Sequence, residues 1–172
     1  MRFSRRIGLF LVTGLGALAI FGIAASPAHA DQGVSTARVL GKLHSGNVRE
    51  MRMGSLALQH AGSQEVKAFG ETLIRDHDLA DTMVVSFAKE RGITLAANTP
   101  PVGPMDLPMG ESFDAAFAKR MLQEHQQTIA DVTKARDGTS DPKLRGLLNE
   151  LLPIFVRHEE MAKKLVDQSP KS

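Results

Sequence analysis

The feature that most constrains the fold is a set of four long segments with helical periodicity, joined by a short, a long and a short connection. In each segment apolar residues recur at alternating spacings of three and four, the pattern of a helix with one buried face. The segments cover about residues 35–61, 63–91, 112–138 and 141–167. None has the alternation of apolar and polar residues that is typical of a half-buried strand. An all-α fold is therefore expected.

Capping residues mark where these helices should begin and end. Gly62 follows the first segment, and Ser63 offers an N-cap for the second. Asp141 is an N-cap for the fourth, with Pro142 at the first helical position, where the missing N–H costs least. Two helical hairpins joined by a longer link predict a ferritin-like antiparallel four-helix bundle.

The longer link is the stretch ITLAANTPPVGPMDLPMG, residues 93–110, which contains four prolines. Fully extended, a link of this length reaches at most about 60 Å. A helix of the expected length is about 40 Å long. The Pro-rich loop could thus cross from one end of the bundle to the other, and a return to the same end is equally compatible with its length.

The first thirty residues have the pattern of a cleavable secretory signal. A basic head precedes an apolar run over residues 7–25, and small residues surround Ala30. The alternative is an uncleaved anchor, because the apolar run almost reaches the length that spans a bilayer. The small residues favour cleavage, so residues 31–172 are expected to form one domain, periplasmic or secreted and without a stable membrane span.

Composition excludes several classes of function. The expected leader holds three of the 21 basic residues and none of the 19 acidic ones, which leaves 18 against 19 in residues 31–172. This near-neutral balance lacks the excess of positive charge that is typical of nucleic-acid-binding proteins. The chain has no cysteine, so disulfides, a thiolate nucleophile and cysteine-ligated zinc are excluded.

A polar layer interrupts the apolar faces of the expected helices. Each segment carries a histidine on its apolar stripe or at the edge of that stripe, near its middle: His44, His77, His125 and His158. Counting ~1.5 Å per residue from the connecting turns puts Glu50, His77 and His125 at one depth. By the same count His44 and His158 come about one turn to either side.

Two of these histidines directly follow an acidic residue, in the dipeptides Asp76–His77 and Glu124–His125. Adjacent residues of a helix point about 100° apart, so one side chain of each pair can face inward and the other the helix interface. The carboxylate is then expected either to bind a metal ion or to orient a neighbouring imidazole.

A buried polar layer must be hydrogen-bonded, hydrated or metal-bound, because an unpaired buried imidazole or carboxylate costs kilocalories. Imidazole nitrogen and carboxylate oxygen are the usual ligands of iron, zinc, copper and manganese. The strongest candidate ligands are Glu50, His77, Glu124 and His125, followed by His44, Asp76 and His158. The alternative is a hydrogen-bonded histidine layer that fixes helix register.

Three stretches, LHSGNVREMRMGSLALQHAGSQEVKAFGETLIRDH, ESFDAAFAKRMLQEHQQTI and LLPIFVRHEEMAKKL, resemble an exported bacterial family, domain of unknown function 4142. Its members are often labelled outer-membrane proteins and are placed in the ferritin-like superfamily. The resemblance covers about residues 38–166. The family's pattern of polar residues is matched in this sequence by His44, Asn47, Glu50, the two acid–His pairs and His158. Ile74 and Leu122 stand where a di-iron Glu-x-x-His motif would have glutamate, so a ferritin-type ferroxidase centre is not expected.

The expected function is metal binding in the cell envelope, for storage, buffering or stress protection. Two alternatives stay open. One is a non-catalytic module that contacts another envelope protein or a second copy of itself. The other is a metal-dependent oxidase, and an enzymatic role is the less favoured of the two.

Overall fold

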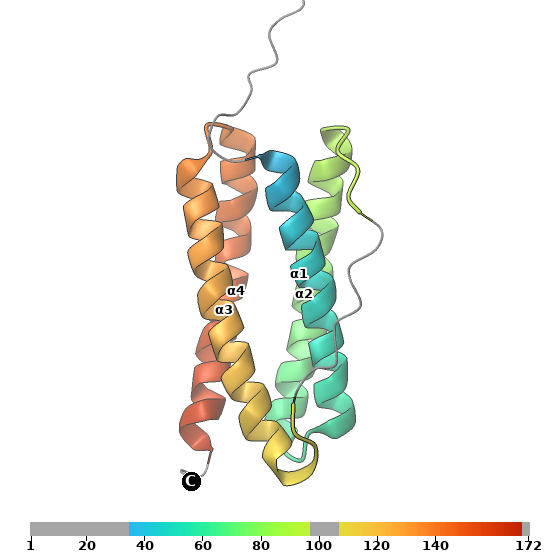
Figure 1. Cartoon of the computed structure of the whole chain (residues 1–172), viewed down its shortest axis with the longest axis vertical. Helices are drawn as coiled ribbons and strands as arrows, with labels where there is room; N and C mark the ends of the chain where they lie inside the picture. The colour runs from blue at the N-terminus through green and yellow to red at the C-terminus, as the bar shows by residue number, and fades with distance from the viewer. Residues whose placement is uncertain (1–34, 97–106, 170–172) are drawn as a thin grey trace, which may run out of the picture. The chain divides into compact units, whose positions relative to one another are not determined.

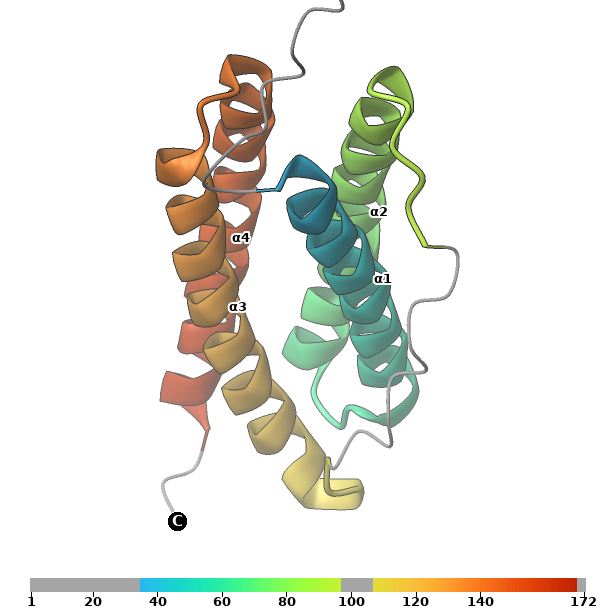
Figure 2. The ribbon, with the colours of Figure 1, turned by 45° about the horizontal axis from the view of Figure 1, so that its top comes forward.

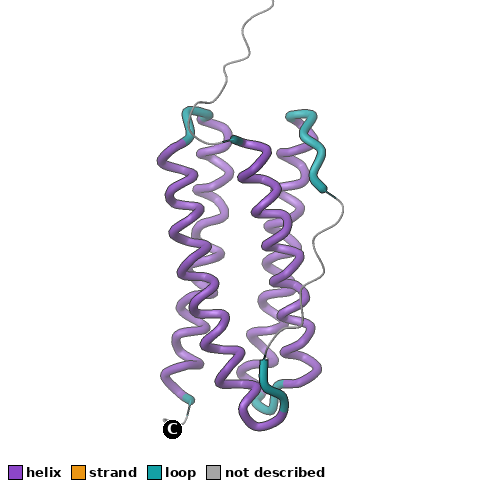
Figure 3. The backbone as a smooth tube through the Cα atoms, viewed as in Figure 1, coloured by secondary structure: helices purple, strands orange, loops and turns teal. Residues whose placement is uncertain are grey.

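The computed structural model describes residues 35–96 and 107–169, and within these ranges it contains helices and no strand (Figure 3). The elements are α1 (Thr36–His60), α2 (Gln64–Glu90), the short 3₁₀ helix η1 (Gly110–Ser112), α3 (Phe113–Gly138) and α4 (Pro142–Gln168) (Figure 1). The predicted all-α four-helix bundle is confirmed.

The helix ends agree with the predicted caps. The Ser63 hydroxyl accepts a hydrogen bond from the Val66 backbone N–H at 3.3 Å. The Asp141 carboxylate accepts one from the Lys143 backbone N–H at 2.9 Å, and Pro142 occupies the first position of α4. Each cap satisfies a backbone donor that the first turn of a helix leaves free.

Contacts at the two ends of the bundle decide its topology. Asp114, at the start of α3, accepts hydrogen bonds from the Gly62 and Ser63 backbone N–H groups in the α1–α2 turn, at 3.0 and 2.7 Å. At the other end Arg91, just after α2, pairs with Asp141 before α4 at 2.6 Å. The link between α2 and α3 therefore joins opposite ends, and every helix is antiparallel to the neighbours it packs on (Figures 1 and 2).

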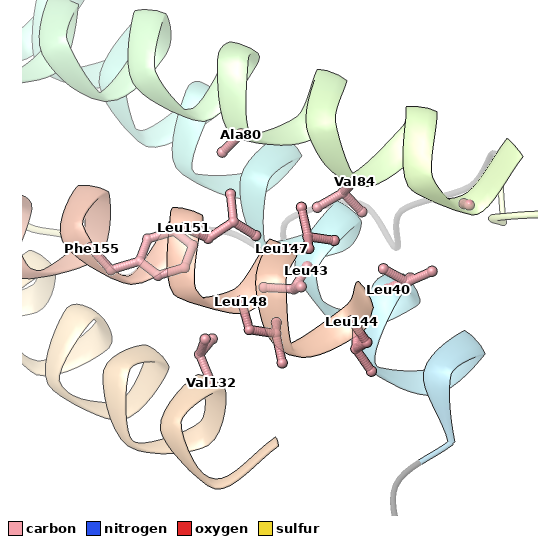
Figure 4. Close-up of a cluster of buried hydrophobic side chains, with 11 residues drawn as sticks. Leu40, Leu43, Ala80, Val84, Val132, Leu144, Leu147, Leu148, Leu151 and Phe155 are labelled. Atoms are coloured by element: carbon pink, nitrogen blue, oxygen red, sulfur yellow. The ribbon is translucent and has the colours of Figure 1, made fainter. Parts of the chain in front are cut away.

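The apolar core consists of two clusters. The α3–α4-end cluster is shown in Figure 4 and contains Leu40, Leu43, Ala80, Val84, Ala88, Val132, Leu144, Leu147, Leu148, Leu151 and Phe155. The α1–α2-end cluster contains Met53, Ala57, Ala61, Val66, Phe69, Leu73, Phe113, Phe117, Met121 and Ala162. Burial of each large apolar side chain contributes about 1.5–3 kcal/mol. The predicted polar layer lies where these clusters meet, between Leu73 and Ala80 on α2.

The backbones of α1 and α2 are in contact at two glycines, Gly54 and Gly70. A Cβ atom on Gly54 would lie 2.4 Å from the carbonyl oxygen of Gly70, and one on Gly70 would lie 2.7 Å from that of Gly54. Neither position can take a side chain without moving the helices apart. The close approach holds α1 against α2 two turns from the polar layer.

The expected signal peptide, residues 1–30, lies outside the described residues, as does most of the Pro-rich link, residues 97–106. Among the helices that are described, none combines the length and apolarity needed to cross a membrane.

Candidate metal centre

The side chains of His77, His125 and His158, from α2, α3 and α4, meet at the centre of the bundle. Their ring centroids are 5.0 Å apart for His77 and His158, 5.2 Å for His125 and His158, and 5.8 Å for His77 and His125. One ring nitrogen of each lies within 4.8 Å of the others. The three residues, here called the histidine triad, are at most 2% exposed.

Each triad imidazole donates a hydrogen bond to an oxygen outside the triad. His77 Nδ1 lies 3.0 Å from Asn47 Oδ1 on α1, and His125 Nδ1 lies 2.9 Å from the Met121 carbonyl oxygen. His158 Nε2 lies 2.9 Å from Asp76 Oδ2. Since a carbonyl or carboxylate oxygen accepts, the imidazole nitrogen is the donor in each pair. A neutral imidazole has one N–H, so the second nitrogen of each ring carries a lone pair.

Among the residues that the structure describes, no N–H or O–H group outside the triad donates to the remaining three nitrogens. His77 Nε2 has no hydrogen-bond partner among the described residues. His158 Nδ1 faces His125 Nε2 at 3.3 Å, and both are the lone-pair nitrogens of their rings. Two nitrogens bound at 2.0–2.1 Å to one tetrahedral ion are separated by about 3.3–3.4 Å. The facing lone pairs therefore have the spacing of two ligands on a shared cation.

Burial keeps the triad neutral. It lowers the pKa of His77 to about 2, with a further contribution from the other two imidazoles, and the pKa of His125 to about 4. Burial also lowers the pKa of His158, against the opposing effect of Asp76. Neutral imidazole is the form that binds metal, so at neutral pH no proton has to leave before an ion binds.

Asp76 orients His158 and is itself held by two arginines. Its carboxylate accepts from Arg75 at 3.0 Å and from Arg157 at 2.5 Å, besides His158. Burial alone would raise the pKa of Asp76, but these three hydrogen bonds outweigh it and lower the pKa to about 2. A charged carboxylate that accepts from the outer N–H of a histidine fixes its tautomer and raises its basicity.

Glu50 on α1 and Glu124 on α3 form a pair of interacting carboxyl groups, and Glu124 directly precedes the triad residue His125. Glu50 is 7% exposed, and burial together with the adjacent Glu124 carboxylate raises its pKa to about 8. Burial would also raise the pKa of Glu124, but Arg120 and Arg49 bind its carboxylate and lower it. At neutral pH the pair thus holds one proton and one negative charge.

Among the seven predicted ligands, the structure brings His77, His125 and His158 into one group. Glu50 and Glu124 form the adjacent carboxyl pair, and Asp76 contacts His158 from outside the triad. His44 is not in this group, because its Nδ1 lies 2.8 Å from Asp81 Oδ1 at a half-buried position.

His158 contacts His125 although residue counting predicts that the two differ in depth. Residue counting put it about one turn from His125, yet the two rings are in contact. One helical turn is about 5.4 Å along the axis. An imidazole side chain can span that offset. The depth of a residue along the helix axis therefore does not by itself decide which side chains are in contact.

The arginine partners of the acidic residues at the site were not predicted, and the sequence indicates them only weakly. Arg120 and Glu124 are four residues apart on one helix, a spacing that predicts an ion pair. The Arg157–Asp76 pair joins residues 81 positions apart and has no such local pattern.

Comparison with known proteins gives a family and a fold. The family model described as Domain of unknown function (DUF4142) matches residues 23–165. Three solved structures superpose on most of the chain. CopM in the Cu(II)-bound form has a TM-score of 0.66 at 16% identity and covers 78% of this chain and 98% of its own. CopM in the apo form gives 0.67 at 16% identity, covering 79% and 98%. CopM in the Ag-bound form, obtained by soaking, gives 0.66 at 14%, covering 80% and 99%. At these identities the likeness is one of fold, and no curated protein matches by sequence.

Proposed function

Because the chain belongs to the DUF4142 family, whose description assigns no activity, we propose a function from the site itself: the protein binds one transition-metal ion at the histidine triad. The observation that carries this proposal is the convergence of three imidazole lone pairs in a buried centre. A hydrogen-bonded layer would give every buried nitrogen a partner. Here His77 Nε2 has none, and the lone pairs of His125 and His158 face each other.

The residues around the triad would hold the ligands in place before the ion arrives. Asn47, the Met121 carbonyl and Asp76 each fix one imidazole in the tautomer that turns its lone pair inward. Such outer hydrogen bonds are the usual support of metal-bound histidines.

Copper is the metal that this donor set favours most. The triad offers three nitrogens and no thiolate, which suits copper, zinc or iron better than manganese, an ion that prefers oxygen. Among divalent ions a nitrogen site binds Cu²⁺ most strongly. Solved CopM structures with the same fold contain Cu(II) or silver, which supports testing copper first.

The burial of the triad favours holding an ion over catalysis. At most 2% of each triad residue is exposed, so a substrate would have little access to a bound metal. We place this protein in the bacterial envelope, on the expected signal peptide, as a metal store or buffer that protects against excess metal.

Metal analysis of the purified protein tests the proposal. After incubation with copper, zinc, iron or manganese and removal of unbound ions, we expect one tightly bound ion per chain, with copper retained best. His125→Ala and His158→Ala should abolish this binding. His60→Ala, at an exposed position of α1, is the matched control and should keep it. Equal metal content in the triad variants and the wild type would contradict the proposal.

A further inference from the structure

We propose that metal ions enter and leave the histidine triad through a pocket at the α1–α2-turn end of the bundle, and that Phe69 is the gate. This inference rests on the proposed metal binding and adds the route and the residue that controls its rate. The two ideas can fail separately, because binding is judged by stoichiometry and the route by kinetics.

The pocket has a volume of about 690 Å³ and lies between the first turns of α2 and α3 and the last turns of α4. Its lining includes Glu65, Phe69, Asp114, Met161, Lys164 and Gln168. Two carboxylates and one ammonium group give it a net negative charge, which attracts cations.

Phe69 separates this pocket from the triad. Its side chain lines the pocket, yet it is only 1% exposed, so the ring presents little surface to solvent. The same ring meets the imidazole of His158 edge to face, with centroids 6.1 Å apart and planes inclined by 70°. One aromatic ring thus stands between the pocket and a triad residue. Met161, one turn after His158 on α4, lines the same pocket and offers a thioether close to the route.

In the opposite direction along the bundle axis, the triad is covered by the α3–α4-end cluster. Phe155 stacks on His77 there, with centroids 5.9 Å apart and planes inclined by 22°. Beyond it the α3–α4-end cluster continues through Leu151, Leu148 and Leu144, all fully buried (Figure 4). An ion from that end would have to displace several packed side chains.

The lateral approaches that pass the carboxylates are positively charged. Arg75 and Arg157 cover Asp76 on one side. Arg49 and Arg120 cover Glu124 on another. Two guanidinium groups repel a cation at each of these places. The pocket is therefore the approach where a single ring, Phe69, contacts both the pocket and a triad residue, and where the charge favours a cation.

Binding kinetics of matched leucine variants test the gate. Apoprotein is mixed with excess Cu²⁺, and the visible absorbance of bound copper is followed by stopped flow, with His158→Ala as the background to subtract. Phe69→Leu should raise both the association rate and the chelator-driven release rate on the order of tenfold, because opening no longer displaces a whole ring from the core. The dissociation constant should change little. Phe155→Leu, an equally buried ring on the other side of the triad, should leave both rates within about twofold of the wild type.

Blocking the pocket tests the route without touching the core. Gln168→Trp places a large side chain in the pocket lining at an exposed position of α4 and should slow association. Gln123→Trp, at an exposed position of α3 outside the pocket lining, should not. Equal rates in Phe69→Leu and Phe155→Leu, or in the two tryptophan variants, would overturn the route while leaving metal binding intact. A wild-type protein that binds no copper would overturn both proposals.

Discussion

His158 Nδ1 lies 3.3 Å from His125 Nε2, and the outer hydrogen bonds of both rings leave these two facing nitrogens without hydrogen. Two lone pairs that face each other in a buried centre repel each other unless a proton or a metal ion lies between them. Burial lowers the pKa of both imidazoles, which disfavours the proton. A metal ion resolves the contact, and His77 supplies a third nitrogen.

Asp76→Asn tests the carboxylate behind His158. The variant replaces a charged acceptor with a neutral amide and should weaken copper binding by about 10–100-fold, as changes in such outer partners usually do. Competition with a chelator of known affinity measures the change. Asp78→Asn, exposed on the same helix, should bind copper like the wild type. An unchanged affinity in Asp76→Asn would mean that Asp76 only pairs with the two arginines.

Glu50 should make the stability of the apoprotein depend on pH. Its folded pKa of about 8 lies above the ordinary 4.5, so the folded state binds the proton more tightly than the unfolded one. The resulting stability is fully present below the unfolded pKa and is lost as pH rises towards 8, at up to about 1.4 kcal/mol per pH unit. Urea unfolding followed by circular dichroism at pH 5 and pH 8 should show this loss relative to Glu50→Gln.

Glu71→Gln, at an exposed position of α2, is the control and should keep the wild-type pH profile. If Glu50→Gln and the wild type lose stability in parallel between pH 5 and pH 8, Glu50 is not held protonated in the folded protein.

Gly54→Ala should destabilise the bundle, because its Cβ would meet the Gly70 carbonyl oxygen at 2.4 Å and force α1 away from α2. Overpacking of this kind costs about 1–3 kcal/mol or more. Gly46→Ala, on the same helix with nothing within 4 Å, should instead add about 0.5–1 kcal/mol from helix propensity. Melting temperatures of the two variants should therefore shift in opposite directions, and shifts of the same sign would contradict the close packing.

The fold was predictable because its determinants are local and periodic. Ser63 and Asp141 mark helix starts by capping, and the apolar stripes show which faces meet. The topology was not predictable, since link length allowed either end. It depends on Asp114 and Arg91, whose partners in the two turns are about fifty residues away along the chain.

The candidate site was predictable as a layer but not as a ligand set. Spacing placed histidines at similar depth on the buried faces, and this is a property of each helix alone. Which acids would reach the centre depends on partners from other helices. Arg157 on α4 holds Asp76, and Arg49 on α1 holds Glu124. No pattern within one helix indicates such pairs.

The most direct test of the central claim is the anomalous diffraction of copper-loaded crystals, recorded at the copper absorption edge. A metal ion at the histidine triad should give one strong anomalous peak per chain, at about 2.0–2.1 Å from His77 Nε2, His125 Nε2 and His158 Nδ1. A peak at any other group, or none in protein that contains stoichiometric copper, would contradict a metal centre at the histidine triad.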